Sequence, residues 1–308
     1  MAGSFRVRIA AGMSDALTDV RNGMTIGIGG ALNAGHPMAL VRALMQGEAR
    51  DLTIVSGFGG MEIDMLAGSG IASRIIAAFV GAEGVAGVPP LLGWAVEQKR
   101  IDAWDIDEGI LLTALRAASQ KLPYATWRCG LGTDAANNPL CQMATDAGTG
   151  LPYLKIRPLD IDVALTWAEA ADTDGNVLRW GPDFGDGGFA DAAALRIVQV
   201  ERIQSTEQLG RSPDRVAPWQ ADVVIAAPLG THPFASTSLI DDLSWLTHYV
   251  STMAALRKQG DWNAVPHPVR GPAAELDFAK WLLVSLKDWR TRPHDMFRWT
   301  GSPQPSQS

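Results

Sequence analysis

The chain has 308 residues, of which 47% are hydrophobic and 19% charged, with a formal net charge of −7. This length and apolar content suit one large α/β domain or two small ones, and the negative charge provides no basic surface for nucleic acid or an anionic membrane. Neither a signal peptide nor a stretch of membrane-spanning length is present, so we expect a cytoplasmic protein in which Cys129 and Cys141 are reduced thiols.

The stretch from Asn22 to Pro37 predicts a buried strand that runs into paired glycines. Met24 to Ile28 form the strand, Gly29 and Gly30 form a turn, and Pro37 suits the first position of a helix. Such a turn exposes backbone N–H groups at the carboxyl end of a sheet, where ligands bind in open α/β folds. A tight turn with only a structural role explains the same glycines.

Two further predicted strands also end in glycine. Residues 51–56 precede Gly57-Phe58-Gly59-Gly60, and residues 74–80 precede Gly81. Apolar residues at helical spacing lie between the three strands, at 38–45 and 61–67. Strands that alternate with helices in this way indicate a parallel sheet with both faces covered.

The remaining chain continues the α/β pattern. Further strands are predicted at 101–105, 161–167, 195–200 and 222–226, and further helices at 91–99, 108–118, 243–258 and 273–289. Residues 129–160 carry little periodicity and are predicted to form an irregular capping excursion, and residues 300–308 a disordered tail. We therefore expect an α/β fold with an open, mostly parallel sheet and helices on both faces, in a single domain over residues 1–299.

Two charged residues are candidates for chemistry at the carboxyl edge of this sheet. Glu108 follows a short strand and opens a helix, which would place it near the glycine turns. A favourable charge at a helix N-terminus explains the same residue. Arg128 precedes Gly130 and is the best placed cation for an acidic ligand, although a structural ion pair accounts for it equally well.

Several other functional classes have little support in the sequence. The five histidines are scattered without a His-x-x-x-His pair, so no metal site is expected. The chain has no Gly-x-Ser-x-Gly elbow for a serine hydrolase and no phosphate-binding loop lysine.

Several short motifs together resemble the α subunits of family I CoA-transferases, in particular those of the glutaconate CoA-transferase type. The N-terminal signature of that family matches Asn22-Gly23, Ile26 to Gly30, Gly35 and Pro37, with departures at Gly27 and Ala31. The downstream matches follow in order: Leu122-Pro123, Gly130-Leu-Gly-Thr-Asp134, Asp174-Gly-Asn176, Val198-Gln-Val-Glu201 and Gly230-Thr-His-Pro233.

The resemblance implies an open α/β/α sheet, an acyl-CoA co-substrate and a homologous β subunit in an αβ or α2β2 assembly. The glutamate that attacks the thioester lies in the β subunit of such enzymes, within a Ser-Glu-Asn-Gly motif that this chain lacks. The glycine loops would then bind the acyl group and the thioester oxyanion, a task suited to preorganised backbone N–H groups. The residues implied are Gly29, Gly30, Asn33, Gly57, Phe58, Gly59, Arg128 and Gly130.

Asp107-Glu108-Gly109 and Leu122-Pro123 also resemble a subgroup, the CoA-dependent ring hydrolases of bacterial steroid degradation. These enzymes keep the transferase fold but hydrolyse a carbon–carbon bond, and the resemblance implies that Glu108 acts as the base. Three hypotheses therefore remain: the α subunit of a CoA-transferase, a CoA-ester hydrolase that uses Glu108, and a non-catalytic binding or regulatory subunit. The departures at Gly27 and Ala31 favour the third.

Overall fold

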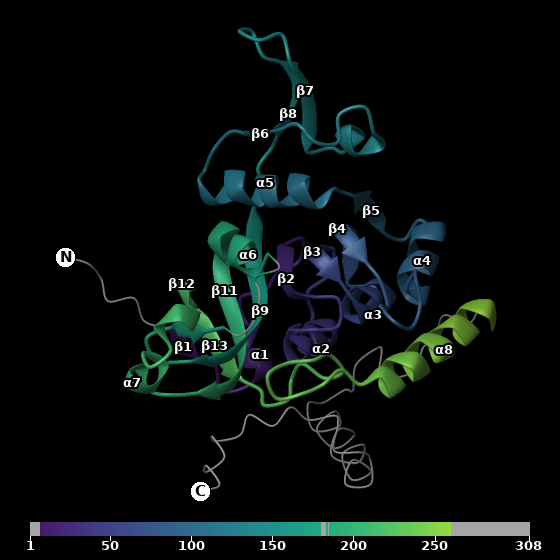
Figure 1. Cartoon of the computed structure of the whole chain (residues 1–308). Coiled ribbons are helices and arrows are strands. Elements are labelled where there is room, and N and C mark those ends of the chain that lie inside the picture. The colour runs from purple at the N-terminus through teal and green to yellow at the C-terminus, as the bar shows by residue number, and fades with distance from the viewer. Residues whose placement is uncertain (1–6, 180–182, 184, 260–308) are drawn as a thin grey trace, which may run out of the picture.

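A computed structural model describes residues 7–179, 183 and 185–259 of the chain. Within these residues the core is a ten-stranded sheet whose main strands run parallel in the spatial order β1-β13-β11-β9-β2-β3-β4-β5 (Figure 1). The strands are β1 Arg8–Ile9, β2 Thr25–Ala31, β3 Leu52–Gly59, β4 Ala72–Val80, β5 Asp102–Asp105, β9 Ile161–Ala171, β11 Ala193–Ile203 and β13 Val223–Ala226. The antiparallel strands β10 Asn176–Leu178 and β12 Val216–Gln220 extend the sheet beside β9.

Helices cover both faces of the sheet, as the alternating sequence pattern predicts. In Figure 1, α5 lies on one side of the sheet and α1, α2 and α3 lie on the other. The helices are α1 Met13–Ala16, α2 Met38–Gln46, α3 Met61–Ser69, α4 Pro90–Glu97, α5 Glu108–Ser119, α6 Asp186–Ala192, α7 Thr206–Leu209 and α8 Leu243–Gln259, with short 3-10 turns at Asp134–Asn137 and Pro213–Arg215. None of the helices in the described ranges is both long and apolar enough to cross a bilayer.

Alternation along the buried strands divides the apolar core into two main layers. Ile54 in β3 and Ile75 in β4 pack in the layer that contains α2 and α3. The next residue in each strand, Val55 and Ile76, packs in the layer that contains α5. Successive side chains of a strand point to opposite faces, so continuous apolar strands are what a sheet buried on both faces requires.

The predicted irregular excursion at 129–160 is wrong in part. Three short strands form a separate antiparallel sheet in the order β6-β8-β7, which extends beyond α5 (Figure 1). The strands are β6 Ala125–Trp127, β7 Cys141–Thr145 and β8 Pro152–Ile156. Only Leu154 and Ile156 of β8 are fully buried, against the α5 layer. Two buried residues at alternate positions are too few for the sequence pattern to predict a strand.

The boundaries of the first elements also differ from the prediction. Strand β2 continues to Ala31 and β3 to Gly59, so Gly29, Gly30, Gly57 and Gly59 belong to the last residues of the strands, whereas Gly60 follows β3. Pro37 precedes α2, which begins at Met38. The predicted helix at 273–289 and the tail at 300–308 lie outside the described residues, and the single-domain organisation stays a prediction.

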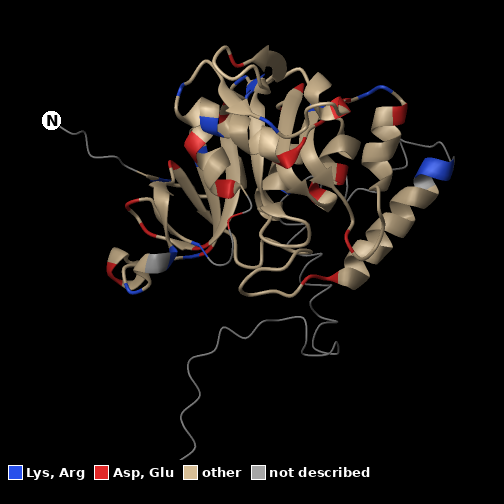
Figure 2. Ribbon diagram, turned by 45° about the horizontal axis from the view of Figure 1, so that its top comes forward, with Lys and Arg blue, Asp and Glu red and all other residues tan. Residues whose placement is uncertain are grey.

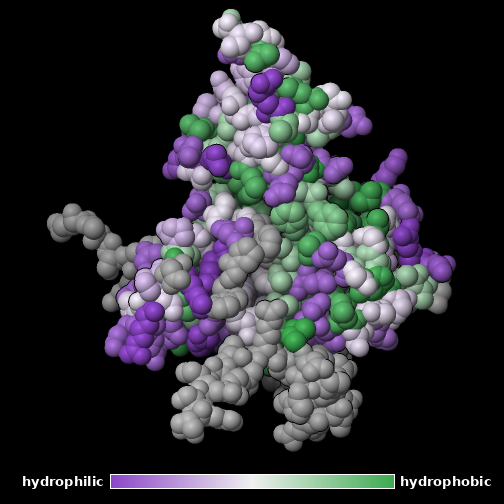
Figure 3. Space-filling view, in the orientation of Figure 1, coloured by the Kyte–Doolittle hydropathy of each residue, from purple (hydrophilic) through white to green (hydrophobic). Residues whose placement is uncertain are grey.

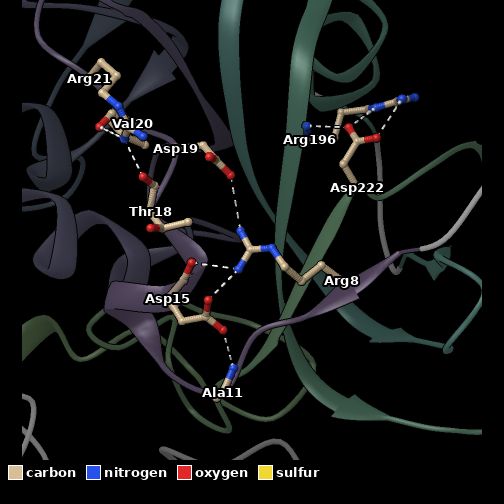
Figure 4. Close-up of polar contacts among 9 residues, drawn as sticks. All are labelled: Arg8, Ala11, Asp15, Thr18, Asp19, Val20, Arg21, Arg196 and Asp222. Carbon is tan, nitrogen blue, oxygen red and sulfur yellow. Dashed lines mark hydrogen bonds and ion pairs between the residues drawn. The ribbon is translucent and has the colours of Figure 1, made fainter.

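Ion pairs join neighbouring elements near the β1 edge of the sheet (Figure 4). The Arg8 guanidinium donates to the Asp15 carboxylate at 2.7 Å and to the Asp15 carbonyl at 2.8 Å, which ties β1 to α1. Arg196 in β11 pairs with Asp222, just before β13, at 2.9 Å. Elsewhere acidic and basic residues are spread along the ribbon without a basic face in this view (Figure 2).

A buried carboxyl group joins three helices on the α2 side of the sheet. Asp64 in α3 accepts hydrogen bonds from the backbone N–H groups of Leu91 and Leu92 at the start of α4, both at 2.7 Å. The Tyr249 hydroxyl of α8 donates to the same carboxyl at 2.8 Å. Burial raises the pKa of Asp64 to about 7, and these three donors oppose the rise.

We expect Tyr249→Phe to lower the free energy of unfolding by about 1 kcal/mol, because one oxygen of the buried Asp64 carboxyl then loses its donor. Urea denaturation at pH 7 measures the change. Tyr124→Phe is the matched control, since Tyr124 is 41% exposed, and should stay within about 0.5 kcal/mol of the parent chain. Equal losses in the two variants would contradict a role for this hydrogen bond.

Candidate functional site

The glycine-rich ends of β2, β3 and β4 lie side by side at the carboxyl edge of the sheet. Ala31 pairs with Phe58 across β2 and β3, and Phe58 pairs with Phe79 across β3 and β4. The Leu32 N–H donates to the Phe58 carbonyl at 2.8 Å, and the Gly81 N–H to the Gly59 carbonyl at 3.0 Å. The structure therefore brings together the predicted residues of the first two glycine stretches.

Asp186 occupies one side of the Gly29-Gly30 backbone. The Gly30 N–H donates to the Asp186 carboxylate at 2.7 Å, and a Cβ on Gly29 would overlap the same oxygen. Arg179 forms an ion pair with Asp186. Burial raises the pKa of Asp186, and the positive charge of Arg179 opposes this. The Gly30 amide that the resemblance assigns to the substrate is thus engaged by a carboxylate of the chain itself.

The His36 ring occupies the other side of Gly30. Gly30 has a φ of +96°, and a Cβ there would lie 2.7 Å from the ring. Asn33, in the loop between Gly30 and His36, donates through its side chain to the Glu83 carbonyl at 3.1 Å. The Asn33 carbonyl accepts from the Ala235 N–H at 2.7 Å. Asn33 therefore holds the loop after β2 to the loops that follow β4 and β13.

Glu108 is the first residue of α5 and is exposed to solvent. The preceding Asp107 accepts a hydrogen bond from the Ile110 N–H at 3.2 Å and caps the helix. Among the residues that the structure describes, none forms a hydrogen bond or ion pair with the Glu108 carboxylate. The capping role thus belongs to Asp107, and the Glu108 carboxylate is accessible to a substrate.

The predicted residues Arg128 and Gly130 lie beside the first turn of α5. A Cβ on Gly109 would overlap the Trp127 ring, and the Gly130 position lies 3.8 Å from the Ile110 side chain. Arg128 lies between Trp127 and Gly130 in the sequence, and its side chain is exposed to solvent. The structure therefore groups Arg128 and Gly130 with Glu108, as a second part of the site.

The strand register gives the separation of the two parts. Ile28, Ser56, Ala77 and Asp105 form one row across β2, β3, β4 and β5. Neighbouring strands are about 5 Å apart, so Asp105 lies roughly 10 Å from Ser56 and roughly 15 Å from Ile28. Glu108 follows three residues after Asp105, so both parts of the site lie along one edge, far enough apart to contact different portions of an extended ligand.

Apolar residues are exposed at this edge. Phe79, at the end of β4, is 48% exposed, and Val88, in the loop that leads to α4, is 71% exposed. Hydrophobic residues also gather over the middle of the face shown in Figure 3, between hydrophilic margins. An apolar area beside a ligand site is typical of a surface that another protein covers.

Sequence reasoning missed three buried polar residues beside the glycines at the ends of β2 and β3: His36, Glu62 and Asp186. Asp186 stands 156 positions from Gly30, and nothing in the local sequence predicts their hydrogen bond. His36 lies within the matched signature, at a position where the signature specifies no residue type. Glu62 is two residues beyond Gly60, and only its place in an apolar helix hints that it is buried.

The departure at Gly27 has a packing explanation. A Cβ on Gly27 would lie 2.7 Å from the Phe189 ring of α6, so Phe189 fills the space of the missing side chain. Phe189 is only 1% exposed. The departure therefore preserves a filled core and gives no support to the regulatory-subunit hypothesis.

Comparisons with known proteins agree with this fold. The family described as coenzyme A transferase matches residues 11–217. The cholesterol ring-cleaving hydrolase IpdA subunit of Mycobacterium tuberculosis is 32% identical over 268 residues, which cover 83% of this chain and 90% of the relative. The A subunit of glutaconate CoA-transferase from Acidaminococcus fermentans is 26% identical over 74% of this chain and 78% of its own.

Two solved structures share the architecture. Glutaconate coenzyme A-transferase from Acidaminococcus fermentans superposes with a TM-score of 0.76 at 23% identity, over 85% of this chain and 91% of its own. The decarboxylase AibA/AibB, as its C56S variant, superposes with a TM-score of 0.73 at 25% identity, over 91% of this chain and 99% of its own.

Proposed function

The chain belongs to the coenzyme A transferase family, and on that premise we propose that it is the α subunit of a heteromeric CoA-transferase. The supporting observation is the glycine edge of β2, β3 and β4, with exposed apolar residues beside it, in a chain that has no Ser-Glu-Asn-Gly motif. The glycine edge can bind the substrate, but the chain lacks the motif that contains the nucleophilic glutamate, so a partner subunit must supply it. The proposal includes a cytoplasmic αβ or α2β2 assembly.

In the proposed reaction, the acyl-CoA thioester is attacked by the glutamate of the β subunit. CoA is expelled as a thiolate and an acyl anhydride forms. The CoA thiolate then attacks the glutamyl carbonyl of the anhydride, the donor acid leaves as its carboxylate, and a glutamyl-CoA thioester remains on the partner. The acceptor carboxylate repeats these steps in reverse and takes the CoA. This chain contributes the backbone of the glycine edge apart from the Gly30 N–H, which Asp186 engages. Fixed backbone groups can orient the thioester carbonyl without reorganising as charge develops.

The purified chain alone is expected to show no CoA transfer and to gain it when co-expressed with the protein encoded beside it. The measurement follows CoA exchange between acyl-CoA esters and free acids over a panel of carboxylic acids. The partner alone is the control and should also be inactive. Full activity of the isolated chain would contradict its role as an α subunit.

A second candidate function is hydrolysis of a CoA ester on the same scaffold. It is supported by the accessible Glu108 carboxylate and by the 32% identity to the IpdA subunit, a cholesterol ring-cleaving hydrolase. Here Glu108 would take a proton from water, and the hydroxide would add to a ring carbonyl. The carbon–carbon bond would then break to give a carboxyl group and a carbanion, which would take the proton back from Glu108. A partner that retains the Ser-Glu-Asn-Gly glutamate favours transfer, and a partner without it favours hydrolysis.

A further inference from the structure

Helix α6 packs against β2 at two glycines. The helix contacts β2 and β9 of the sheet as well as α5 (Figure 1). The Phe189 ring fills the space that a side chain at Gly27 would take, and the Asp186 carboxylate fills that at Gly29. The two glycines are two residues apart and face the same side of the strand, whereas Asp186 and Phe189 are one helical turn apart on the same face of α6. This side of β2 is therefore shaped to receive α6.

Asp186 is the polar member of this contact and holds the end of β2. Its Oδ1 atom accepts the hydrogen bond from the Gly30 N–H at 2.7 Å. Its Oδ2 atom accepts from the Arg179 guanidinium, which follows β10. Only 4% of Asp186 and 14% of the Arg179 side chain are exposed. Removal of one partner from such a buried group leaves the other unsatisfied, so the Asp186 carboxylate joins Gly30 to Arg179 firmly.

The held residue, Gly30, leads directly into a tight turn. The Ala31 N–H donates to the Ala34 carbonyl and the Ala34 N–H to the Ala31 carbonyl, both at 2.9 Å. This turn contains Asn33, whose side chain reaches the Glu83 carbonyl. Glycine is conformationally permissive, so contacts with the rest of the fold must fix the φ of +96° at Gly30. A contact that holds the Gly30 amide thereby sets the position of the turn and of Asn33.

We propose that Asp186 is a positioning residue of the acyl-CoA site and that Arg179 holds it in place. Asp186 is buried against β2 and does not contact the substrate. By holding the Gly30 amide, it keeps the turn that contains Asn33 in the orientation that catalysis requires. The consequence for turnover rests on the proposed function, whereas the hydrogen bond between Asp186 and Gly30 does not.

Asp186→Asn is the decisive variant because it keeps the size of the side chain. Asparagine has one oxygen for two donors, the Gly30 N–H and the Arg179 guanidinium. The charged guanidinium takes this oxygen, since charge-assisted hydrogen bonds are the stronger ones, and the asparagine NH2 group then faces the Gly30 N–H. Addition of Arg179→Met removes the competing donor. In this double variant the asparagine oxygen is again available to Gly30.

The first test measures kcat of the enzyme complex at saturating acyl-CoA. Asp186→Asn is expected to lower kcat at least about tenfold, because small displacements of positioning groups slow catalysis strongly. The double variant is expected to recover most of this loss.

Asp222→Asn is the matched control. Asp222 also pairs with an arginine, Arg196, but it precedes β13 and lies at the opposite edge of the sheet from the glycines. Its variant should keep the kcat of the parent complex. An unchanged kcat in Asp186→Asn overturns the proposal, and so does an equal loss in Asp222→Asn or a double variant that recovers nothing.

A second measurement does not depend on activity. Amide hydrogen exchange of the full chain, followed by mass spectrometry on peptides that cover residues 24–37, reports on the Gly30 N–H. Exchange in these peptides is expected to be faster in Asp186→Asn, to return toward the parent rate in the double variant and to be unchanged in Asp222→Asn.

Exchange at residues 24–37 that is equal in Asp186→Asn and the parent chain overturns the proposed contact. Faster exchange across the whole sheet shows a general structural role of Asp186 and also overturns the proposal. If the chain and its partner show no CoA activity, only the proposed function fails, because hydrogen exchange still reports on the contact between Asp186 and Gly30.

Discussion

Glu108→Gln is expected to lower the rate of CoA-ester ring hydrolysis by at least about 100-fold and to leave CoA transfer unchanged. Glutamine keeps the size of the side chain and leaves the Asp107 cap of α5 in place, so the helix persists. It removes the one group at this position that can take a proton from water. In transfer the reacting carboxylate belongs to the partner, so the same change has no chemical consequence.

The measurement is kcat for each reaction with the purified complex. Asp105→Asn is the matched control, because Asp105 is another exposed carboxylate at the end of β5, three residues earlier. It should leave both rates unchanged. An equal loss of rate in both variants would indicate a general effect of charge at this edge. An unchanged hydrolysis rate in Glu108→Gln would mean that Glu108 acts only as a favourable charge at a helix terminus.

Gly30→Ala is expected to be strongly destabilising, because both the backbone conformation and the packing at Gly30 oppose an added methyl group. The φ of +96° strains any L side chain, at a cost of about 1–3 kcal/mol. The added Cβ would also lie 2.7 Å from the His36 ring and 2.8 Å from the His36 backbone nitrogen, which adds about 1–3 kcal/mol. We expect a total loss of several kcal/mol in the free energy of unfolding, together with loss of catalysis.

Urea denaturation of the full chain measures this loss. Gly70→Ala separates the two causes, because Gly70 has a φ of +75° but no atom within 4 Å of its Cβ position. Its cost should therefore be limited to backbone strain, about 1–2 kcal/mol. If the two variants lose the same stability, the close packing of His36 on Gly30 contributes nothing.

The sequence pattern predicts the central sheet well because its strands are buried on both faces. Five predicted strands are largely apolar, and each agrees with a strand of the structure to within one residue at its start or lies inside it: 51–56, 74–80, 161–167, 195–200 and 222–226. The pattern does not predict β6, β7 and β8, where one face is exposed and the inward residues are few. The spacing of apolar residues in the sequence indicates which positions are buried. It therefore predicts strands poorly where only a few residues of a strand are buried.

Some candidate site residues could be predicted from the local sequence, and others could not. The glycines at the ends of β2 and β3 could be found because a strand followed by glycine is a local signal. The contacts that enclose them could not, since Asp186 reaches Gly30 through the tertiary fold, and the tertiary fold also buries Glu62, a neighbour of Gly60 in sequence, against His36. Their chemistry depends on burial and on distant partners, which a single sequence does not encode in its spacing.

The packing of Phe189 on Gly27 has a consequence for how the fold can change in evolution. A branched apolar residue at position 27 would match the family signature but would collide with Phe189, and a smaller residue at 189 alone would leave a cavity behind β2. Each change is harmful by itself, and the two together compensate. The positions form one epistatic unit, so their mutational costs will not add.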